Sequence, residues 1–181
     1  MEERPNNRET ERLIRKSMHG SFQAFGQLIH LYQDYLYRTA YLYMKNEDDA
    51  LDVVQDCILT AYEAVGGLRK PEYFRTWLTR ILINCALKAL QDGSRIMCME
   101  ELPEQGSGRD AHIEERCDLY HAVDRLPEQY RTVVILKYYN DMKISEISEI
   151  MDIPEGSVKS YLFRAKKELR TYLQEDYVYA E

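Results

Sequence analysis

The stretch Ile144–Leu173, ISEISEIMDIPEGSVKSYLFRAKKELRTYL, predicts a short helix, a tight turn and a longer helix. Its first part carries apolar residues at helical spacing, namely Ile144, Ile147 and Met151. Pro154 suits the first position of the second helix, where a missing N–H has no cost, and Gly156 and Ser157 keep the turn compact. The second helix carries one apolar stripe, formed by Val158, Leu162, Ala165, Leu169 and Leu173. This layout predicts a helix-turn-helix.

The second helix of this stretch is basic although the chain as a whole is acidic. Ser157–Leu173 holds five Lys or Arg residues and one acid, a net charge of +4, whereas the whole chain carries −7. Lys and Arg attract phosphates, and Ser and Arg near the start of such a helix reach base edges in the major groove. The alternative is an ordinary amphipathic helix with a solvated basic face. The preceding helix and the turn favour contact with DNA.

Composition and patterning predict an all-α protein with one or two small domains. The chain has 181 residues, of which 45% are hydrophobic and 30% charged, and this excludes a wholly disordered protein. Apolar residues recur at helical spacing, while strand-like alternation is scarce. The net charge of −7 argues against an indiscriminate nucleic-acid binder. Acidic and basic segments alternate along the chain, which suggests a protein partner as well as DNA.

Membrane segments, metal sites and enzyme sites are not expected. The charged N-terminus lacks the apolar core of a signal peptide, and no apolar run is long enough to insert directly into a membrane. The four cysteines form no C-x-x-C pair and are interpreted as reduced thiols of a cytoplasmic protein. His112, Cys117 and His121 do not share one helix face cleanly, so no metal site is predicted. No Gly-rich phosphate loop, nucleophile elbow or H-E-x-x-H motif indicates an enzyme or a cofactor site.

The N-terminal half is expected to be one helical unit. The first strong apolar stripe begins after Ser21, and the unit continues to about Gln91. A second helix is expected to begin near Asn46, whose side chain caps it, and to end at the Gly66-Gly67 pair. A short basic loop follows, and then a helix over Tyr73–Leu90.

The C-terminal half is expected to be a second helical unit, separated from the first by a linker. Gly, Ser and Pro residues and clustered acids break the helical periodicity between the two. We therefore expect a first domain over residues 1–92, a flexible acidic linker over 93–118 and a helix-turn-helix domain over 119–181. Within the last domain a helix is expected over Tyr130–Tyr139.

Both halves resemble one protein family. The segment LPEQYRTVVILKYY (residues 126–139), followed by the helix-turn-helix stretch, closely resembles the promoter-reading C-terminal domain of bacterial extracytoplasmic-function (ECF) sigma factors. The segments DDALDVVQDCILTAY (48–62) and YFRTWLTRILINCAL (73–87) are similar to the other domain of that family. The two sets of motifs occur in the family's order with a linker between them.

The resemblance implies a function without catalysis. ECF sigma factors are dissociable subunits of bacterial RNA polymerase that direct the core enzyme to particular promoters and help to open the duplex. The implied partners are core RNA polymerase, promoter DNA and an anti-sigma factor, which in this family is often membrane-bound. The implied location is the cytoplasm, with no cofactor. The linker is implied to thread through the polymerase toward the RNA exit path.

The resemblance also implies a polymerase-binding surface. The family's D-x-x-Q-[DE] stretch docks on the clamp coiled coil of the largest polymerase subunit, and here it corresponds to Asp52, Gln55 and Asp56. Two carboxylates four residues apart share a helix face, and an acidic face suits a basic partner helix. Without the rest of the motif, a solvated acidic face would be the simpler interpretation.

The basic loop and the helix after it are implied to read the promoter's −10 element. Family members flip a base of the non-template strand into a pocket formed partly by this loop, and basic and aromatic groups suit a single strand. The implied contacts are Arg69, Lys70, Phe74, Arg75, Arg80, Asn84 and Lys88. Trp77 is expected in the core, whereas Phe74 suits either a DNA contact or the core.

The basic helix of the helix-turn-helix is implied to read the −35 element. The implied contacts are Ser157, Lys159, Ser160, Tyr161, Phe163, Arg164 and Lys167. Tyr161 departs from the family pattern, because many relatives have Arg there, so one contact is either missing or replaced by a hydroxyl contact. Lys143 departs as well, since Ser or Thr is the commoner cap at that point, and Asp141 is a candidate substitute.

Two other interpretations account for part of the sequence. A two-domain helix-turn-helix regulator acting without polymerase explains the C-terminal half but not the DVVQD segment (52–56) or the basic-aromatic loop. A pure interaction protein that has lost DNA binding is hinted at only by Tyr161.

Overall fold

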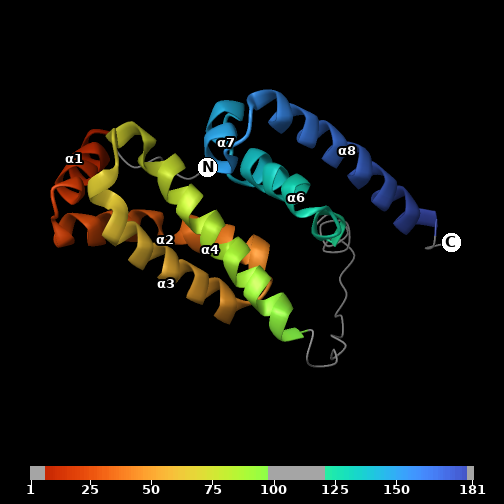
Figure 1. Ribbon diagram of the computed structural model, residues 1–181, viewed down its shortest axis with the longest axis horizontal. Coiled ribbons are helices and arrows are strands. Elements are labelled where there is room, and N and C mark those ends of the chain that lie inside the picture. The colour runs from red at the N-terminus through yellow and green to blue at the C-terminus, as the bar shows by residue number, and fades with distance from the viewer. Residues whose placement is uncertain (1–6, 98–120, 179–181) are drawn as a thin grey trace. The chain divides into compact units, whose positions relative to one another are not determined.

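The computed structural model describes residues 7–97 and 121–178 (Figure 1). Within these ranges all regular secondary structure is helical, and short turns connect the helices. The chain divides into two compact units, Met1–Glu101 and Leu102–Glu181. The predicted all-α fold is confirmed. None of the described helices is both long and apolar enough to cross a membrane.

The first unit is a bundle in which helix α2 (Phe22–Met44) packs against α3 (Glu47–Ala64) and α4 (Phe74–Met97) (Figure 1). Two short 3-10 segments, η1 (Val65–Gly67) and η2 (Pro71–Tyr73), connect α3 to α4. The core is filled by fully buried side chains from all three helices: Leu28, Leu36, Ala40, Cys57, Ala61, Leu78 and Leu82. Burial of these apolar stripes is the main stabilising contribution to such a bundle.

Capping residues set the boundaries of these helices. The Ser21 hydroxyl accepts a hydrogen bond from the Ala24 N–H at 3.3 Å and begins α2. Lys45 takes a left-handed conformation, with φ 65°, and ends α2. The Asn46 side-chain oxygen then accepts the Asp49 N–H at 2.8 Å and begins α3, as predicted. The chain therefore reverses direction over two residues.

Helix α1 (Asn7–Met18) was not expected from the sequence. It packs against α2 and buries Thr10, Leu13, Ile14 and Ser17. The Ser17 hydroxyl donates to the Leu13 carbonyl oxygen at 2.8 Å. The helical unit therefore begins well before Ser21.

Helix α4 extends to Met97, so residues 93–97 of the expected linker are helical. The remainder of that linker falls in residues 98–120, outside the described part of the chain. Two of the three residues weighed as metal ligands, His112 and Cys117, lie there as well. No cluster of three or more His, Cys, Asp or Glu side chains suited to a metal ion occurs among the residues described.

The second unit contains a helical stretch at 121–124, helix α6 (Glu128–Val134), helix α7 (Ile144–Met151) and helix α8 (Glu155–Val178). A π-helical segment η3 (Ile135–Tyr139) continues α6 and ends where the Asn140 N–H donates to the Ile135 carbonyl at 3.1 Å. The sequence predicted one uninterrupted helix here. Residues 132–136 are all buried, so the junction between α6 and η3 lies in the core of the second unit.

Helices α7 and α8 form the predicted helix-turn-helix, but the turn differs from the prediction. Asp152 ends α7 with φ 54°, and the Pro154 carbonyl accepts the Ser157 and Val158 N–H groups at 2.8 and 3.2 Å. Pro154 therefore lies just before α8, while Gly156 and Ser157 belong to its first turn. The tight connection comes from the left-handed Asp152.

The start of α7 has no side-chain cap from Lys143 or from Asp141. Lys143 has no side-chain acceptor, and its backbone N–H donates instead to the Glu146 carboxylate at 2.7 Å. The Glu146 carboxylate thus satisfies the N–H of the residue that precedes α7, which is one half of a capping box.

Candidate protein- and DNA-binding surfaces

Helix α3 presents an acidic stripe to solvent. Asp52, Gln55 and Asp56, here called the α3 stripe, are all exposed. The opposite face of α3 is buried through Ala50, Val53, Val54, Cys57 and Ala61, and this fixes the rotation of the helix. The structure therefore brings the three sequence-predicted residues onto one accessible surface.

Two leucines that sequence reasoning did not select flank the α3 stripe. Leu51 is 47% exposed and Leu59 is 64% exposed. Neither leucine falls on the buried face of α3, although leucine is usually a core residue. An apolar residue outside the apolar stripe is the sequence signal that identifies both. Charged groups beside exposed leucines are typical of a helix-docking surface, because apolar contact supplies affinity and charge supplies orientation.

The loop between η1 and η2 presents two basic residues. Leu68 is buried on one side of them and Pro71 on the other, so Arg69 and Lys70 are held outward and exposed. The Lys70 ammonium lies 5.9 Å from the centre of the Tyr73 ring. Tyr73 is itself 44% exposed, which places cationic and aromatic groups together at the start of α4.

Helix α4 continues this basic surface. Arg80, Asn84 and Lys88, here called the α4 row, are exposed and repeat every four residues, so they follow one line along the helix. Arg75, in the first turn of α4, is half-buried, with its guanidinium 5.0 Å from the centre of the Tyr35 ring. The Tyr35 and Thr79 hydroxyls are 2.7 Å apart, and this hydrogen bond fixes the ring under Arg75.

The sequence left two roles open for Phe74, a DNA contact and a core position, and its burial in this structure supports the core position. Its side chain is only 1% exposed. The ring lies 5.5 Å from the Tyr32 ring and 5.7 Å from the Trp77 ring, centre to centre. Phe74 is therefore a core residue that anchors the start of α4.

Helix α8 exposes most of the predicted −35 residues. Val158, Leu162 and Ala165 are buried, so Lys159, Ser160, Phe163, Arg164 and Lys167 point away from the core, while Ser157 and Tyr161 are half-buried. Phe163 is 73% exposed, which is unusual for a large apolar ring. The Ser160 hydroxyl donates to the Gly156 carbonyl at 2.9 Å, so its oxygen keeps an acceptor site toward solvent.

Arg164 has a defined neighbour on α6. Its Nη1 atom donates to the Tyr130 hydroxyl at 3.4 Å, and the Tyr130 and Tyr161 rings lie 5.5 Å apart. The hydrogen bond to Tyr130 raises the pKa of Arg164 above its usual value. Arg164 is therefore charged near neutral pH.

The family is decided by comparison with known proteins. The Sigma-70 region 2 model matches residues 28–96, and the Sigma-70 region 4 model matches residues 118–169. The RNA polymerase sigma factor SigV of Bacillus subtilis is 37% identical over 146 residues, which cover 80% of this chain and 87% of the relative. The chain belongs to the ECF family of RNA polymerase sigma factors.

Further comparisons agree with this assignment. The ECF sigma factor SigW of Bacillus subtilis is 28% identical over 90% of this chain and 95% of its own length. The structure of CnrH in complex with the cytosolic domain of CnrY matches with a TM-score of 0.72 at 24% identity, over 93% of this chain and 99% of CnrH, and shows the same fold. The predicted function, promoter-specific initiation with core RNA polymerase, is confirmed at the level of the family, and a regulator acting without polymerase is not favoured.

The region 2 match contains the α3 stripe and the α4 row, and the region 4 match contains the helix-turn-helix. The roles of the individual residues stay predictions. Sigma factors are in general DNA-binding regulators rather than enzymes.

Two thiols, the buried Cys57 and the half-buried Cys85, lie where the surfaces of this sigma factor meet. Burial raises the pKa of Cys57 to about 12, with a smaller contribution from Cys85. Burial also raises the pKa of Cys85, and the Asp56 carboxylate adds to the effect while Lys88 opposes it. Asp56 and Lys88 both act on Cys85, so the α3 stripe borders one end of the α4 row. Both thiols stay protonated near neutral pH and are poor nucleophiles.

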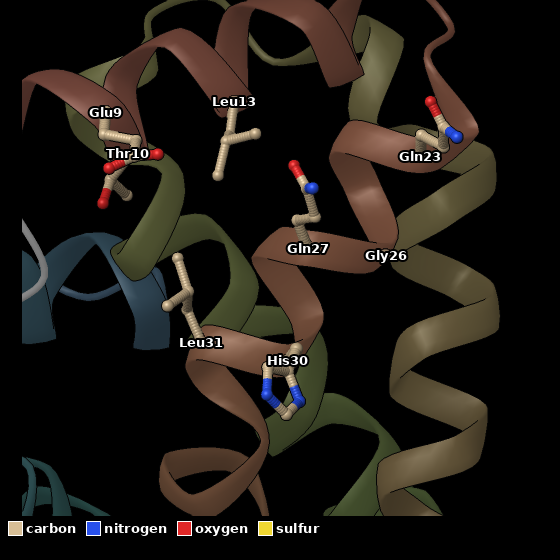
Figure 2. Close-up of a pocket in the computed structure, with 8 residues that line it drawn as sticks. All are labelled: Glu9, Thr10, Leu13, Gln23, Gly26, Gln27, His30 and Leu31. Carbon is tan, nitrogen blue, oxygen red and sulfur yellow. The ribbon is translucent and has the colours of Figure 1, made fainter.

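An open cavity of about 700 Å³ lies between α1 and α2. Glu9, Thr10 and Leu13 from α1 and Gln23, Gly26, Gln27, His30 and Leu31 from α2 line it (Figure 2). None of the predicted contact residues is among them.

Proposed function

We propose that this sigma factor docks on core RNA polymerase through the α3 stripe and reads its promoter with two separate surfaces. Residues 1–92 carry polymerase binding and −10 recognition, residues 119–181 carry −35 recognition, and residues 93–118 connect them. The observation that carries the proposal is the opposite charge of α3 and α4. These helices pack together, yet one exposes Asp52 and Asp56 and the other exposes Arg80 and Lys88.

The α3 stripe suits a protein partner rather than DNA. Its carboxylates repel phosphates and attract a basic helix, with the amide of Gln55 adding hydrogen-bonding capacity. Leu51 and Leu59 add apolar area on either side, and burial of such area contributes roughly 25 cal/mol per Å². We propose that the two leucines belong to the same docking surface.

The α4 row suits the −10 element of one DNA strand. Eight residues of helix separate Arg80 from Lys88, a rise of about 12 Å. This length follows roughly three nucleotides at about 3.4 Å each. Arg69, Lys70 and Arg75 extend the positive charge past Tyr73. Tyr73 takes the place of Phe74 as the accessible aromatic ring for an unpaired base.

Helix α8 suits the −35 element of duplex DNA. Lys159 and Lys167 provide phosphate contacts, while Ser160 and Arg164 present hydrogen-bonding groups suited to base edges. Phe163 offers an apolar contact of the kind made with a thymine methyl group. Ser157 and Tyr161 lie at the flank of the same face.

We also propose that an anti-sigma factor holds this protein inactive in the cytoplasm, and that the protein has no catalytic activity or cofactor of its own. The structure of RpoE in complex with the anti-sigma factor NepR from Bartonella quintana matches with a TM-score of 0.65 at 22% identity, over 83% of this chain and 96% of RpoE. The likeness of fold and the exposed leucines of α3 support such a partner. The partner is proposed to be membrane-bound, while this chain itself does not insert into the membrane.

Run-off transcription with purified core polymerase and a library of promoter templates tests this function. Wild-type protein should give transcripts from a subset of the templates. Asp52→Ala with Gln55→Ala should reduce transcription and retention on core polymerase together, because both changes remove the docking contacts. Gln33→Ala with Asp34→Ala, an exposed acid and amide on α2, is the matched control and should behave like wild type. Absence of transcripts from every template with wild-type protein would overturn the assignment.

A further inference from the structure

Tyr130 lies where α6 meets α8, and two contacts fix its ring. The residue is half-buried and packs against the core cluster of Val123, Leu126, Val134 and Ala165. Its ring also lies 5.5 Å from the Tyr161 ring, at an interplanar angle of 50°. A tyrosine held on two sides presents its hydroxyl in one direction at little further loss of side-chain freedom.

The Tyr130 hydroxyl meets Arg164 on the exposed face of α8. It accepts a hydrogen bond from the Arg164 Nη1 atom at 3.4 Å. An arginine on an exposed helix face otherwise samples many rotamers, and fixing one of them at the moment of binding costs free energy. A guanidinium has five N–H groups, so one bond to Tyr130 leaves enough donors for a bidentate pair with a base.

We propose that Tyr130 is a positioning residue for promoter recognition, holding the Arg164 guanidinium in the orientation that reads a guanine edge. The inference rests on the proposed function, in which α8 lies in the major groove. Tyr161 takes part as the support of the Tyr130 ring, and this gives a physical role to a position where the chain departs from its family. Arginine paired to the O6 and N7 atoms of guanine is the base contact that a pre-oriented guanidinium suits best.

The hydroxyl group has one other way to act on DNA. It accepts the Arg164 N–H but keeps its own proton, which a phosphate oxygen can accept. Direct phosphate contact would strengthen binding to all sequences alike, whereas positioning of Arg164 changes the preference at a single base pair. The two roles are therefore separated by base preference and by coupling to Arg164.

Full-length protein in holoenzyme, transcribing a promoter library randomised over the −35 element, tests the inference. Tyr130→Phe keeps the ring and removes only the hydroxyl. It should lower the preference for guanine at one position by roughly three- to tenfold, the range expected for one hydrogen bond. Arg164→Ala should abolish the preference at that same position, and adding Tyr130→Phe to Arg164→Ala should have no further effect.

Tyr138→Phe is the control, because Tyr138 is an exposed tyrosine of the same unit, 53% accessible, whose ring lies under Lys166. It should leave the base preference unchanged. An unchanged preference in Tyr130→Phe would overturn the inference, as would an equal loss in the presence and absence of Arg164. Either result would overturn the role of Tyr130 alone, because the wild type would still transcribe from its promoters and the proposed function would stand. If the wild type transcribes no member of the library, the proposed function fails and the inference fails with it.

Discussion

Replacing Phe74 by alanine separates a core role from a DNA-contact role. Phe74 is 1% exposed and lies between Tyr32 and Trp77, so the substitution removes a buried ring and leaves a cavity. Changes from Phe to Ala in such sites cost about 3–5 kcal/mol. With a urea dependence of about 1.5 kcal/mol per molar for a small domain, a loss of about 4 kcal/mol lowers the unfolding midpoint by roughly 2–3 M.

Intrinsic fluorescence measures this change in the first unit alone, because Trp77 is the only tryptophan of the chain. The midpoint of the urea transition is the quantity to compare, since the loss of a neighbouring ring also changes the intensity. Arg80→Ala, an exposed change on the same helix, should alter the free energy of unfolding by less than about 0.5 kcal/mol. Its urea midpoint should therefore stay close to that of the wild type. A Phe74→Ala protein with an unchanged midpoint and impaired promoter opening would refute the core assignment.

Three further outcomes are expected. Asn46→Ala should destabilise the first unit by about 1 kcal/mol, because the Asp49 N–H loses its capping oxygen; a urea transition matching wild type would contradict this. Leu59→Ser should weaken retention on core polymerase without lowering the unfolding midpoint, and a lowered midpoint would show Leu59 to be structural. The pKa of Cys57 is raised in the folded protein to about 12, against 9.0 for a free thiol, so the unfolded chain releases this proton at lower pH. The free energy of unfolding should therefore fall between about pH 9 and 12. Cys57→Ala should reduce that fall in a series of urea transitions.

The two helices of the helix-turn-helix were predictable because helical spacing recurs on both sides of one short break, whereas the residue that makes the turn, Asp152, was not identified. The exposure of the α3 stripe was predictable from the apolar residues that orient α3, whereas its selection as a binding surface came from the resemblance to the family. Helix α1 was missed because its charged residues dominate the composition, although Thr10, Leu13, Ile14 and Ser17 carry the helical spacing of a buried face.

Phe74 shows where reading a single segment fails. Phe74, Leu78 and Leu82 repeat every four residues and are all buried, which is the signal that assigns Phe74 to the core. Aromatic residues beside basic ones at the start of α4 suggested DNA contact equally well. The contacts that decide the matter come from Tyr32 on α2, far away in sequence. The pairing of Tyr130 with Arg164, 34 residues apart, is likewise a property of tertiary packing.

The π-helical segment η3 has a consequence for how the length of region 4 can vary among related proteins. A π turn accommodates one residue more than an α turn, so deleting a single residue there lets the helix return to regular geometry. A deletion from a regular α-helix would rotate everything after it by about 100°. A deletion within η3 would avoid that rotation, because the π turn already takes up the extra residue within a single turn. A chain one residue shorter at this point would therefore present its recognition helix in the same orientation.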